Sequence, residues 1–327
     1  MILIVTPAPV DSDQGNGVTA RRWAGILGEL GWPVEMRNDY AGGDYAALIA
    51  LHARRSAPAV RAFHADHPDA PIVIAMTGTD LYPDLDATGV DPGVLARAAR
   101  LVVLQPHGLR QLGPELARRT HVITQSVPPI PPRAARRDRF EVAFLAHVRA
   151  VKDPLLPAAA VRLLPQASRV RVVHVGAARD EALAARAAAE SAANPRYDWL
   201  GPVPRADALA VLARSRVMVL TSSHEGGANV VSEALAAGVP VISSAIPGSI
   251  GLLGDDYPGY FPPGDAAALA DLLSAVERDR DGIHRELRER CLALRPLVDP
   301  AREKAAFADL LRALGLPAAG RAGCRQV

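Results

Sequence analysis

Short apolar runs recur along the first half of the chain and alternate with segments of helical periodicity. The runs predict strands at residues 2–6, 33–37, 48–52, 72–77, 101–105 and 121–126. Helical patterns lie between several of these strands, at residues 18–30, 55–66, 91–99 and 107–118. Strands that alternate with helices indicate βαβ units and a mainly parallel sheet.

The second half of the chain repeats this alternation. Its predicted strands are residues 141–147, 169–176, 197–201, 217–222 and 240–244. Its predicted helices are residues 154–164, 179–193, 205–214, 229–237, 266–278, 283–293 and 300–314. The sequence therefore predicts an α/β protein of two tandem Rossmann-like, doubly wound domains. Ligands of such sheets bind beyond the carboxyl ends of the strands, so we expect the site in an interdomain cleft.

A proline-rich segment separates the two halves. Residues 127–139, VPPIPPRAARRDR, contain four prolines and a cluster of arginines, which cannot continue a helix or a central strand. We therefore predict an N-terminal domain over 1–130 and a C-terminal domain over 131–299. A last helix over 300–316 is expected to cross back to the first domain, and 317–327 to be a frayed tail.

The composition excludes several classes of protein. Apolar residues make up 49% of the chain, enough for a sizeable core, and the net charge of +2 argues against a dedicated nucleic-acid binder. Cys291 and Cys324 show no spacing typical of a metal site or a disulfide framework. The chain starts with a strand-like pattern and has no run near the roughly 20 apolar residues of a membrane span. We expect a soluble, cytoplasmic protein.

Two glutamates mark the least ordinary stretch, SSHEGGANVVSEALAAGVPVISS at 222–244. Glu225 falls in the loop after a buried strand, and Glu233 one turn into the next helix, for which Asn229 is the expected N-cap. Gly226 and Gly227 let backbone N–H groups approach a ligand closely, and the helix N-terminus favours anions. Carboxylates accept hydrogen bonds from vicinal sugar hydroxyls. The alternative is two solvated surface acids.

Two cations and a glycine pair follow the first strands of the two halves. Arg149 and Lys152 lie three apart at a strand-to-helix turn, where they are expected to clamp a diphosphate, the alternative being two solvated cations. Gly15 and Gly17 flank Asn16 in the first half, before the predicted helix. These glycines alone are weak evidence and also fit a simple turn.

Further polar residues cluster at strand ends of the first half. They are candidates for contacts with an acceptor substrate, although a histidine at a strand end is often structural and paired arginines often cap a surface. The set at the strand ends is His52, Arg54, Arg55, Thr77, Thr79 and Asp80; Thr19 and Arg22, in the predicted helix 18–30, are further candidates.

The glutamate stretch resembles the signature of the GT-B glycosyltransferases of family 4, E-G-x6-E followed by A-x-A-A-G-x-P-V. The matching positions are Glu225, Gly226, Glu233, Ala234, Ala236, Ala237, Gly238, Pro240 and Val241. The resemblance implies that Glu225 contacts the hydroxyls of the donor sugar and that Glu233 holds the ribose of the nucleotide. It also implies donor contacts from Gly226, Gly227, Ala228, Asn229 and Val230.

The resemblance extends to the other motifs. It implies that Arg149 and Lys152 neutralise the donor diphosphate, although family members space the two cations further apart. It also implies that the loop with Gly15, Asn16 and Gly17 approaches the donor phosphate and the acceptor.

Several segments are more similar to one subgroup, the selenosugar synthase of bacterial selenoneine biosynthesis. The similarity covers about residues 1 to 312 and is carried by TPAPVDSDQGNGVTARRWA, ALHARRSA, MTGTDLY, VKDP, HEGGANVVSEALAAGVPV and SAIPGSIGLLGDDYPGYFP. It implies transfer of a hexosyl group, GlcNAc or glucose, from a UDP-sugar to selenophosphate. Such an acceptor needs cations but no strong general base, which Arg54 and Arg55 with Arg21 or Arg22 could satisfy.

Three alternatives stay open: a family 4 enzyme with a hydroxyl acceptor, a UDP-sugar epimerase on the same fold, and a sensor that binds a UDP-sugar without turnover. No cofactor or metal is expected, because Asp84 and Asp86 lie in a turn-like segment and cations can neutralise the leaving diphosphate instead. The expected partners are the two small-molecule substrates. The oligomeric state is left open.

Overall fold

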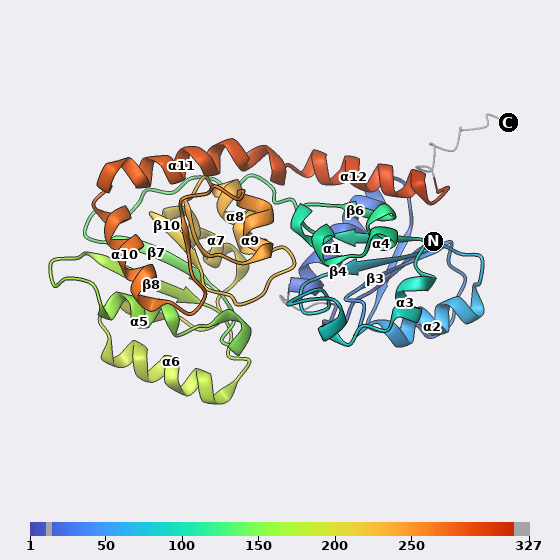
Figure 1. The fold of residues 1–327 in the computed structure, drawn as a ribbon, viewed down its shortest axis with the longest axis horizontal. Helices are drawn as coiled ribbons and strands as arrows, with labels where there is room; N and C mark the ends of the chain where they lie inside the picture. The colour runs from blue at the N-terminus through green and yellow to red at the C-terminus, as the bar shows by residue number, and fades with distance from the viewer. Residues whose placement is uncertain (11–14, 317–327) are drawn as a thin grey trace. The chain divides into compact units, whose positions relative to one another are not determined.

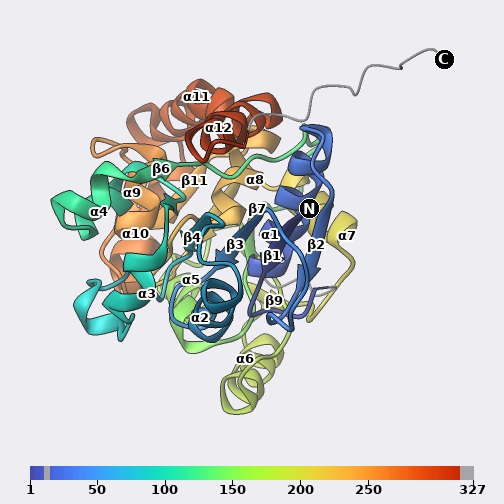
Figure 2. The ribbon, with the colours of Figure 1, turned by 90° about the vertical axis from the view of Figure 1, so that its right-hand side faces the viewer.

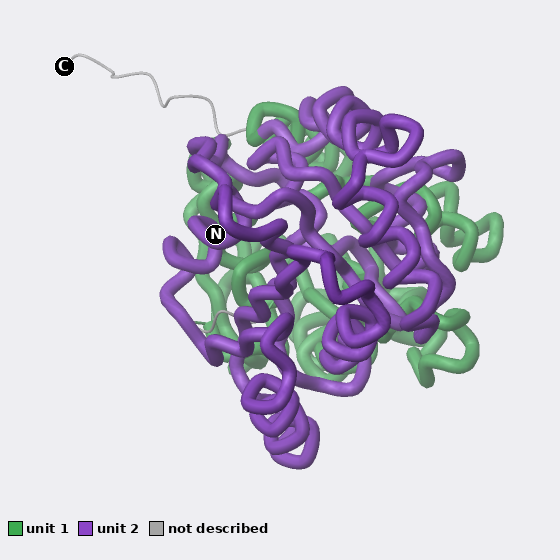
Figure 3. Tube along the Cα trace, turned by 90° about the vertical axis from the view of Figure 1, so that its left-hand side faces the viewer, with its two compact units in different colours: residues 1–125, 300–327 green, residues 126–299 purple. Residues whose placement is uncertain are grey.

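The computed structural model describes residues 1–10 and 15–316, which form two compact units (Figure 3). Unit 1 comprises Met1–Gln125 and Pro300–Val327, and unit 2 comprises Ser126–Asp299. The predicted frayed tail, residues 317–327, lies outside the described residues. Val127 and Ile130 of the proline-rich segment are buried in the hydrophobic core of unit 2, which explains why this segment groups with unit 2.

Unit 1 is built on one parallel sheet of six strands (Figure 1). Its order is β2-β1-β3-β4-β5-β6, and every neighbouring pair is parallel. The strands are β1 (Ile2–Val5), β2 (Val34–Arg37), β3 (Ala47–Leu51), β4 (Ile72–Met76), β5 (Arg100–Val103) and β6 (Thr120–Val122). All six predicted strands of the first half are therefore confirmed, with ends shifted by a few residues.

Helices cover both faces of this sheet (Figures 1 and 2). They are α1 (Gly15–Glu29), α2 (Ala57–Asp66), α3 (Pro92–Arg97), α4 (Pro114–Arg118) and α12 (Pro300–Ala313), with 3₁₀ turns η1 (Asp86–Thr88) and η2 (Pro106–Gln111). Because strand side chains alternate between faces, Leu48 packs with α2 and α3, whereas Ile49 packs with α1 and α12. The predicted helix 107–118 is wrong as one element: it is split into η2 and α4, because Pro114 starts a new helix.

Unit 2 has a second parallel sheet of six strands, in the order β12-β11-β10-β7-β8-β9. The strands are β7 (Phe140–Leu145), β8 (Val170–Val175), β9 (Tyr197–Trp199), β10 (Val217–Leu220), β11 (Val241–Ser244) and β12 (Tyr260–Phe261). Strand β12 was not predicted, because a strand of two residues leaves no detectable alternation. The five predicted strands of this half are confirmed.

The helices of unit 2 agree with the predicted ones except for α9. They are α5 (Leu156–Arg162), α6 (Glu181–Ala193), α7 (Arg205–Arg214), α8 (Asn229–Ala237), α9 (Pro247–Leu253), α10 (Ala266–Glu277) and α11 (Ile283–Leu294), with η3 (Ala150–Lys152), η4 (Arg280–Gly282) and η5 (Arg295–Val298). The missed helix α9 has only seven residues, two of them glycines. The expected N-cap at Asn229 is wrong by one position: Ala228 is the N-cap and Asn229 begins α8.

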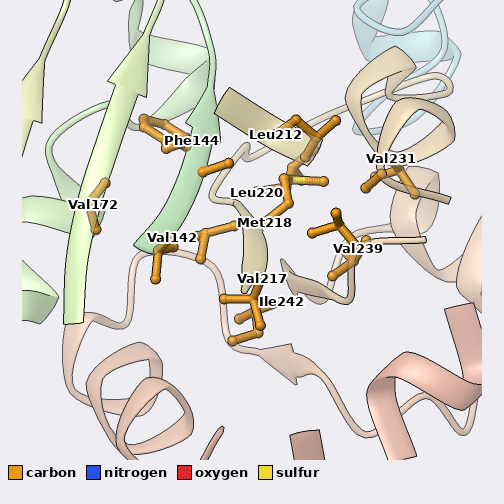
Figure 4. Packing of buried hydrophobic residues seen from close by; sticks show 14 of the residues in the cluster. Val142, Phe144, Val172, Leu212, Val217, Met218, Leu220, Val231, Val239 and Ile242 are labelled. Carbon is orange, nitrogen blue, oxygen red and sulfur yellow. The ribbon is translucent and has the colours of Figure 1, made fainter. Parts of the chain in front are cut away.

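The core of unit 2 lies between its central strands and the covering helices (Figure 4). Val142 of β7, Met218 of β10 and Ile242 of β11 are completely buried, and Val231 of α8 packs with them. His174 of β8 is buried beside this core, where burial lowers its pKa to about 4. This packing fixes the position of α8, which follows the loop that contains Glu225. Within residues 1–10 and 15–316, no helix has the length and apolar character needed to cross a membrane.

A buried carboxylate attaches α12 to α1 in unit 1. Glu303 accepts hydrogen bonds from Nε of Arg22 at 2.9 Å and from Nε1 of Trp23 at 2.8 Å, and its side chain is fully buried. Phe307 adds an edge-to-face contact with Trp23, with ring centroids 5.0 Å apart. The last helix is therefore part of the core of unit 1.

We predict that Glu303→Ala destabilises unit 1 by about 3–5 kcal/mol, because the guanidinium of Arg22 and the buried indole N–H of Trp23 lose this carboxylate. Urea unfolding followed by tryptophan fluorescence measures the effect. Lys304→Ala is the matched control, because it removes the neighbouring but exposed ion pair with Glu29 and should have little effect. Equal destabilisation by the two substitutions would contradict this role of Glu303.

Candidate functional site

Two loops at the carboxyl ends of adjacent strands of unit 2 are joined by hydrogen bonds. The loop after β10 contributes Thr221, whose Oγ1 donates to the carbonyl oxygens of Lys152 at 2.7 Å and Asp153 at 3.1 Å. The backbone N–H of Ser223 donates to the carbonyl of Val151 at 2.9 Å. The loop with Glu225 is thereby held against the turn with Lys152.

This arrangement brings Lys152 and Glu225 together. Nζ of Lys152 donates to Oε1 of Glu225, and the hydroxyl of Ser222 donates to the same oxygen at 2.7 Å. The side chains are 17% and 13% exposed, so the pair is sheltered but reachable from solvent. Oε2 of Glu225 has no hydrogen-bond partner among the described residues, which leaves an acceptor for a ligand hydroxyl.

Arg149 lies at the start of the same turn but outside this pair. It occupies the N-cap of η3, its side chain is exposed, and its guanidinium forms no ion pair with a described residue. The next residue after η3, Asp153, has a left-handed backbone with φ of 42°. Partial burial raises the pKa of Asp153. The structure thus unites one of the two predicted cations with Glu225 and leaves the other free for an anion.

A close backbone contact fixes the other side of the Glu225 loop. A Cβ atom on Gly248, in the first turn of α9, would lie 2.2 Å from the carbonyl oxygen of Glu225. Only glycine allows α9 to pack this closely on the loop. The hydroxyl of Ser244 also donates to the carbonyl of Ser222 at 2.7 Å. Gly248 was not predicted as a site residue, although its place after Ile246 and Pro247 is a helix-start signal.

Glu233 is the second acid of the site. It lies in α8, is 5% exposed, and its carboxylate is 2.7 Å from Nη2 of Arg205, the first residue of α7. The arginine side chain is 47% exposed, so the carboxylate is anchored from the solvent side. Arg205 was also missed, because no local pattern connects residues so far apart in the chain. The predicted alternative of a solvated acid is wrong for Glu233.

The glycine-rich segment of unit 1 forms the first turn of α1. Gly15 begins the helix, and Gly17 is buried. The hydroxyl of Thr19 donates to the carbonyl of Gly15 at 2.8 Å and accepts from Nε2 of Gln125 at 2.6 Å. Thr19 thus has internal partners, and its predicted contact with an acceptor stays a prediction, as do the donor contacts of Gly15, Asn16 and Gly17.

A second polar cluster lies at the carboxyl ends of β3 and β4 in unit 1. Asp80 is fully buried, and its Oδ1 accepts from the backbone N–H groups of Thr77 and Gly78, both at 2.8 Å. Its Oδ2 accepts from the N–H of Ala53 at 2.8 Å. One carboxylate therefore joins the loops after two adjacent strands.

His52 completes this cluster. It is 3% exposed and has a left-handed φ of 70°, with Nε2 3.0 Å from Oγ1 of Thr79. Its Nδ1 has no hydrogen-bond partner within the described ranges, and it lies 3.7 Å from Oδ2 of Asp80. Burial lowers the pKa of His52 against the opposing effect of Asp80, so the imidazole is neutral at neutral pH.

The three predicted arginines of unit 1 have different surroundings. Arg22 is paired with the buried Glu303 of α12. Nη1 of Arg54 donates to the carbonyl of Thr88 at 2.9 Å, whereas Arg55 is exposed and forms no ion pair with a described residue. Arg55 is therefore the most available cation beside the His52 cluster. The acceptor role of Arg22 stays a prediction that would require sharing its guanidinium with Glu303.

The described part of the chain contains no group of three or more His, Cys, Asp or Glu side chains placed to hold a metal ion. The expectation of a reaction without metal stays a prediction.

The model of one protein family matches most of unit 2. Residues 130–292 match the family described as glycosyl transferases group 1. The match includes the Lys152 turn, the Glu225 loop, Arg205 and Glu233. No curated protein is similar enough in sequence to count as a match.

Solved GT-B structures share the fold of nearly the whole chain, including unit 1, which the family model does not cover. HepE of Anabaena, in complex with UDP and glucose, is 15% identical, with 95% of this chain and 99% of that chain covered and a TM-score of 0.74. Sucrose-phosphate synthase from Thermosynechococcus elongatus is 17% identical, with coverages of 96% and 98% and a TM-score of 0.75. A UDP-forming α,α-trehalose-phosphate synthase from Burkholderia vietnamiensis is 14% identical, covers 93% and 79%, and has a TM-score of 0.68. The predicted fold class, two Rossmann-like domains of the GT-B type, is confirmed.

We predict that Gly248→Ala destabilises unit 2 by about 1–3 kcal/mol, because the added methyl group forces α9 away from the Glu225 loop. Urea unfolding measures the change in the free energy of unfolding. Gly25→Ala is the control: a Cβ atom added to Gly25 of α1 would meet no described atom within 4 Å beyond its own helix, so the substitution should stabilise the helix by about 0.5–1 kcal/mol. Unchanged stability of the Gly248 variant would exclude the tight contact.

Proposed function

We propose that this protein is a glycosyltransferase that moves a hexosyl group, GlcNAc or glucose, from a UDP-sugar to selenophosphate. The observation that carries the transferase part is the pairing of Lys152 with Glu225 in the group 1 domain. The selenium part rests on the similarity of the quoted segments to the selenosugar synthases. The proposal places the donor in unit 2 and the acceptor in unit 1.

Adjacent parts of the donor would contact Lys152 and Glu225. In a UDP-sugar one bridging oxygen joins the sugar to the phosphate, so a carboxylate beside an ammonium group matches the hydroxyls and the phosphate of one donor molecule. Oε2 of Glu225 would accept from the sugar hydroxyls. Glu233 would accept from the ribose hydroxyls, with Arg205 as the positioning residue that holds its carboxylate. The backbone of 226–230 would line the path between the two acids.

The proposed role of the two cations is to stabilise the negatively charged leaving group, UDP. Selenium would form a bond to the anomeric carbon while the bond from that carbon to the UDP oxygen breaks, and UDP would leave with the electron pair. Lys152 and the exposed Arg149 would stabilise the negative charge that develops on the diphosphate, so that no metal is needed. Water must then cleave the selenium–phosphorus bond before a free 1-seleno sugar is obtained.

The His52 cluster supports an ionised acceptor in unit 1. Selenophosphate carries two or more negative charges and needs no proton removal. Arg55 and Arg54 would attract it, and Thr77 and Thr79 would donate hydrogen bonds. Because His52 is neutral, it adds no positive charge to this cluster and does not depend on a negative charge of the acceptor.

One observation favours a second candidate, a glycosyltransferase with a hydroxyl acceptor. Nδ1 of His52 lies near Oδ2 of Asp80, and a neutral imidazole beside a carboxylate is the arrangement of a general base. In this reading His52 would take the proton of the hydroxyl, which is typically worth about 10²–10⁴-fold in rate. The two candidates differ in the product and in the importance of His52.

The acceptor is tested with purified protein, selenophosphate and either UDP-GlcNAc or UDP-glucose. We expect UDP release that depends on selenophosphate, and a product containing selenium and one hexosyl group by mass spectrometry. His52→Gln should keep most of this activity, because the nucleophile is already ionised. UDP release without selenium in the product would refute the selenium proposal and leave the transferase intact. Interconversion of UDP-sugars without acceptor would identify an epimerase, and binding without turnover a sensor.

The two acids are separated by their effects on binding and turnover. We expect Glu233→Ala to weaken UDP binding, because the ribose loses its acceptor. Glu225→Ala should reduce sugar transfer far more than UDP affinity. Calorimetric titration with UDP and initial rates of UDP release measure the two effects. Equal UDP affinity in the wild type and Glu233→Ala would refute the ribose role.

A further inference from the structure

Three neighbouring strands of unit 2 each begin directly after an arginine. Arg139 precedes β7, Arg169 precedes β8 and Arg216 precedes β10, and β7 lies between the other two strands in the sheet. Adjacent strands are about 4.8 Å apart, so three guanidinium groups gather at the amino-terminal edge of one sheet. The backbone N–H of Phe140, which follows Arg139, donates to the carbonyl of Arg169 at 2.9 Å, which places these two arginines side by side.

These arginines surround a cavity of about 300 Å³. Arg137 adds a fourth guanidinium group to its lining, and Phe140, Glu277 and His284 complete the wall. The His284 ring is fixed there, with Nε2 3.2 Å from the carbonyl of Arg216 and an edge contact to Phe140. The volume is at the lower end of the range for small-molecule pockets.

Few acids balance the positive charge. Among the described residues, Glu277 is the one carboxylate of the lining, and it accepts from the hydroxyl of Ser168 at 2.7 Å and the N–H of Arg169 at 2.6 Å. Asp138 lies 3.4 Å from Nε of Arg139 but is 61% exposed and is also bound to Arg136.

The guanidinium groups themselves have unused donors. Those of Arg137, Arg169 and Arg216 form no hydrogen bond or ion pair with a described residue. Nε of Arg139 is buried and has no hydrogen-bond partner in the part of the chain that the structure describes. Four guanidinium groups thus line one cavity, and the carboxylates described beside them are Glu277 and the exposed Asp138.

We propose that this cavity is a second anion site, which binds a small molecule carrying a phosphate or diphosphate group. Guanidinium groups bind phosphate oxygens through paired hydrogen bonds. The summed positive charge of several arginines is larger than the negative charge of one carboxylate ligand, so a phosphate or diphosphate fits better. The site is distinct from the proposed donor site, because the donor loops follow the carboxyl ends of β7 and β10. Six residues of β7 place the two edges of the sheet roughly 20 Å apart.

Calorimetric titration with pyrophosphate tests the site, with and without saturating UDP. We expect one binding event that UDP does not abolish. In the Arg169→Ala/Arg216→Ala double variant, this event should be weakened by roughly tenfold or more, because two of its charge-assisted contacts are lost. Retention of UDP binding and of the far-UV circular dichroism spectrum shows that the double variant is folded.

Arg288→Ala is the matched control, since it removes an exposed arginine of α11 outside the cavity lining and should leave the affinity unchanged. The proposal is overturned if no pyrophosphate binds in the presence of UDP, if the double variant binds as the wild type does, or if Arg288→Ala causes the same loss. These outcomes are independent of the transferase assay, so each proposal can fail alone.

Discussion

The hydrogen bonds that Thr221 and Ser223 donate to the turn after β7 are the contacts on which the polar site of unit 2 depends. Parallel strands deliver their loops to one edge of a sheet, but this alone leaves each loop free to choose its own conformation. The loop after β10 donates hydrogen bonds to backbone carbonyls of the turn, and these bonds restrict the conformations of both segments. Lys152 and Glu225 therefore lie together as a consequence of backbone geometry. Gly248 allows α9 to pack closely against the Glu225 loop.

In unit 1, a side chain joins the loops that follow two adjacent strands. The carboxylate of Asp80 binds three backbone N–H groups from the loops after β3 and β4 and is shielded from water. Its cost of burial is offset by these donors, which supply the hydrogen bonds that water would otherwise provide. The histidine next to it is held neutral and oriented. In each unit, then, the residues available for chemistry stand on a backbone that adjacent loops lock together.

Much of the fold could be predicted from the sequence, because buried parallel strands are continuous apolar runs and the intervening helices are long enough to show their period. Short elements such as β12 and α9 could not, since two to seven residues carry too little pattern. In the site, Glu225 and Glu233 were recognisable from their motif. Arg205 and Gly248 were not, because an ion pair and a close backbone approach depend on tertiary packing. The arginines before β7, β8 and β10 gain significance only when the strand order is known.

The attachment of α12 also has a consequence for synthesis of the chain. Unit 1 is discontinuous: its first segment ends at Gln125, and its last helix begins at Pro300, after the whole of unit 2. While the ribosome is still making residues 126–299, the surface of α1 around Trp23 lacks the helix that covers it. Unit 2 is continuous in the chain, whereas the core of unit 1 stays incomplete until a helix made after the whole of unit 2 is added.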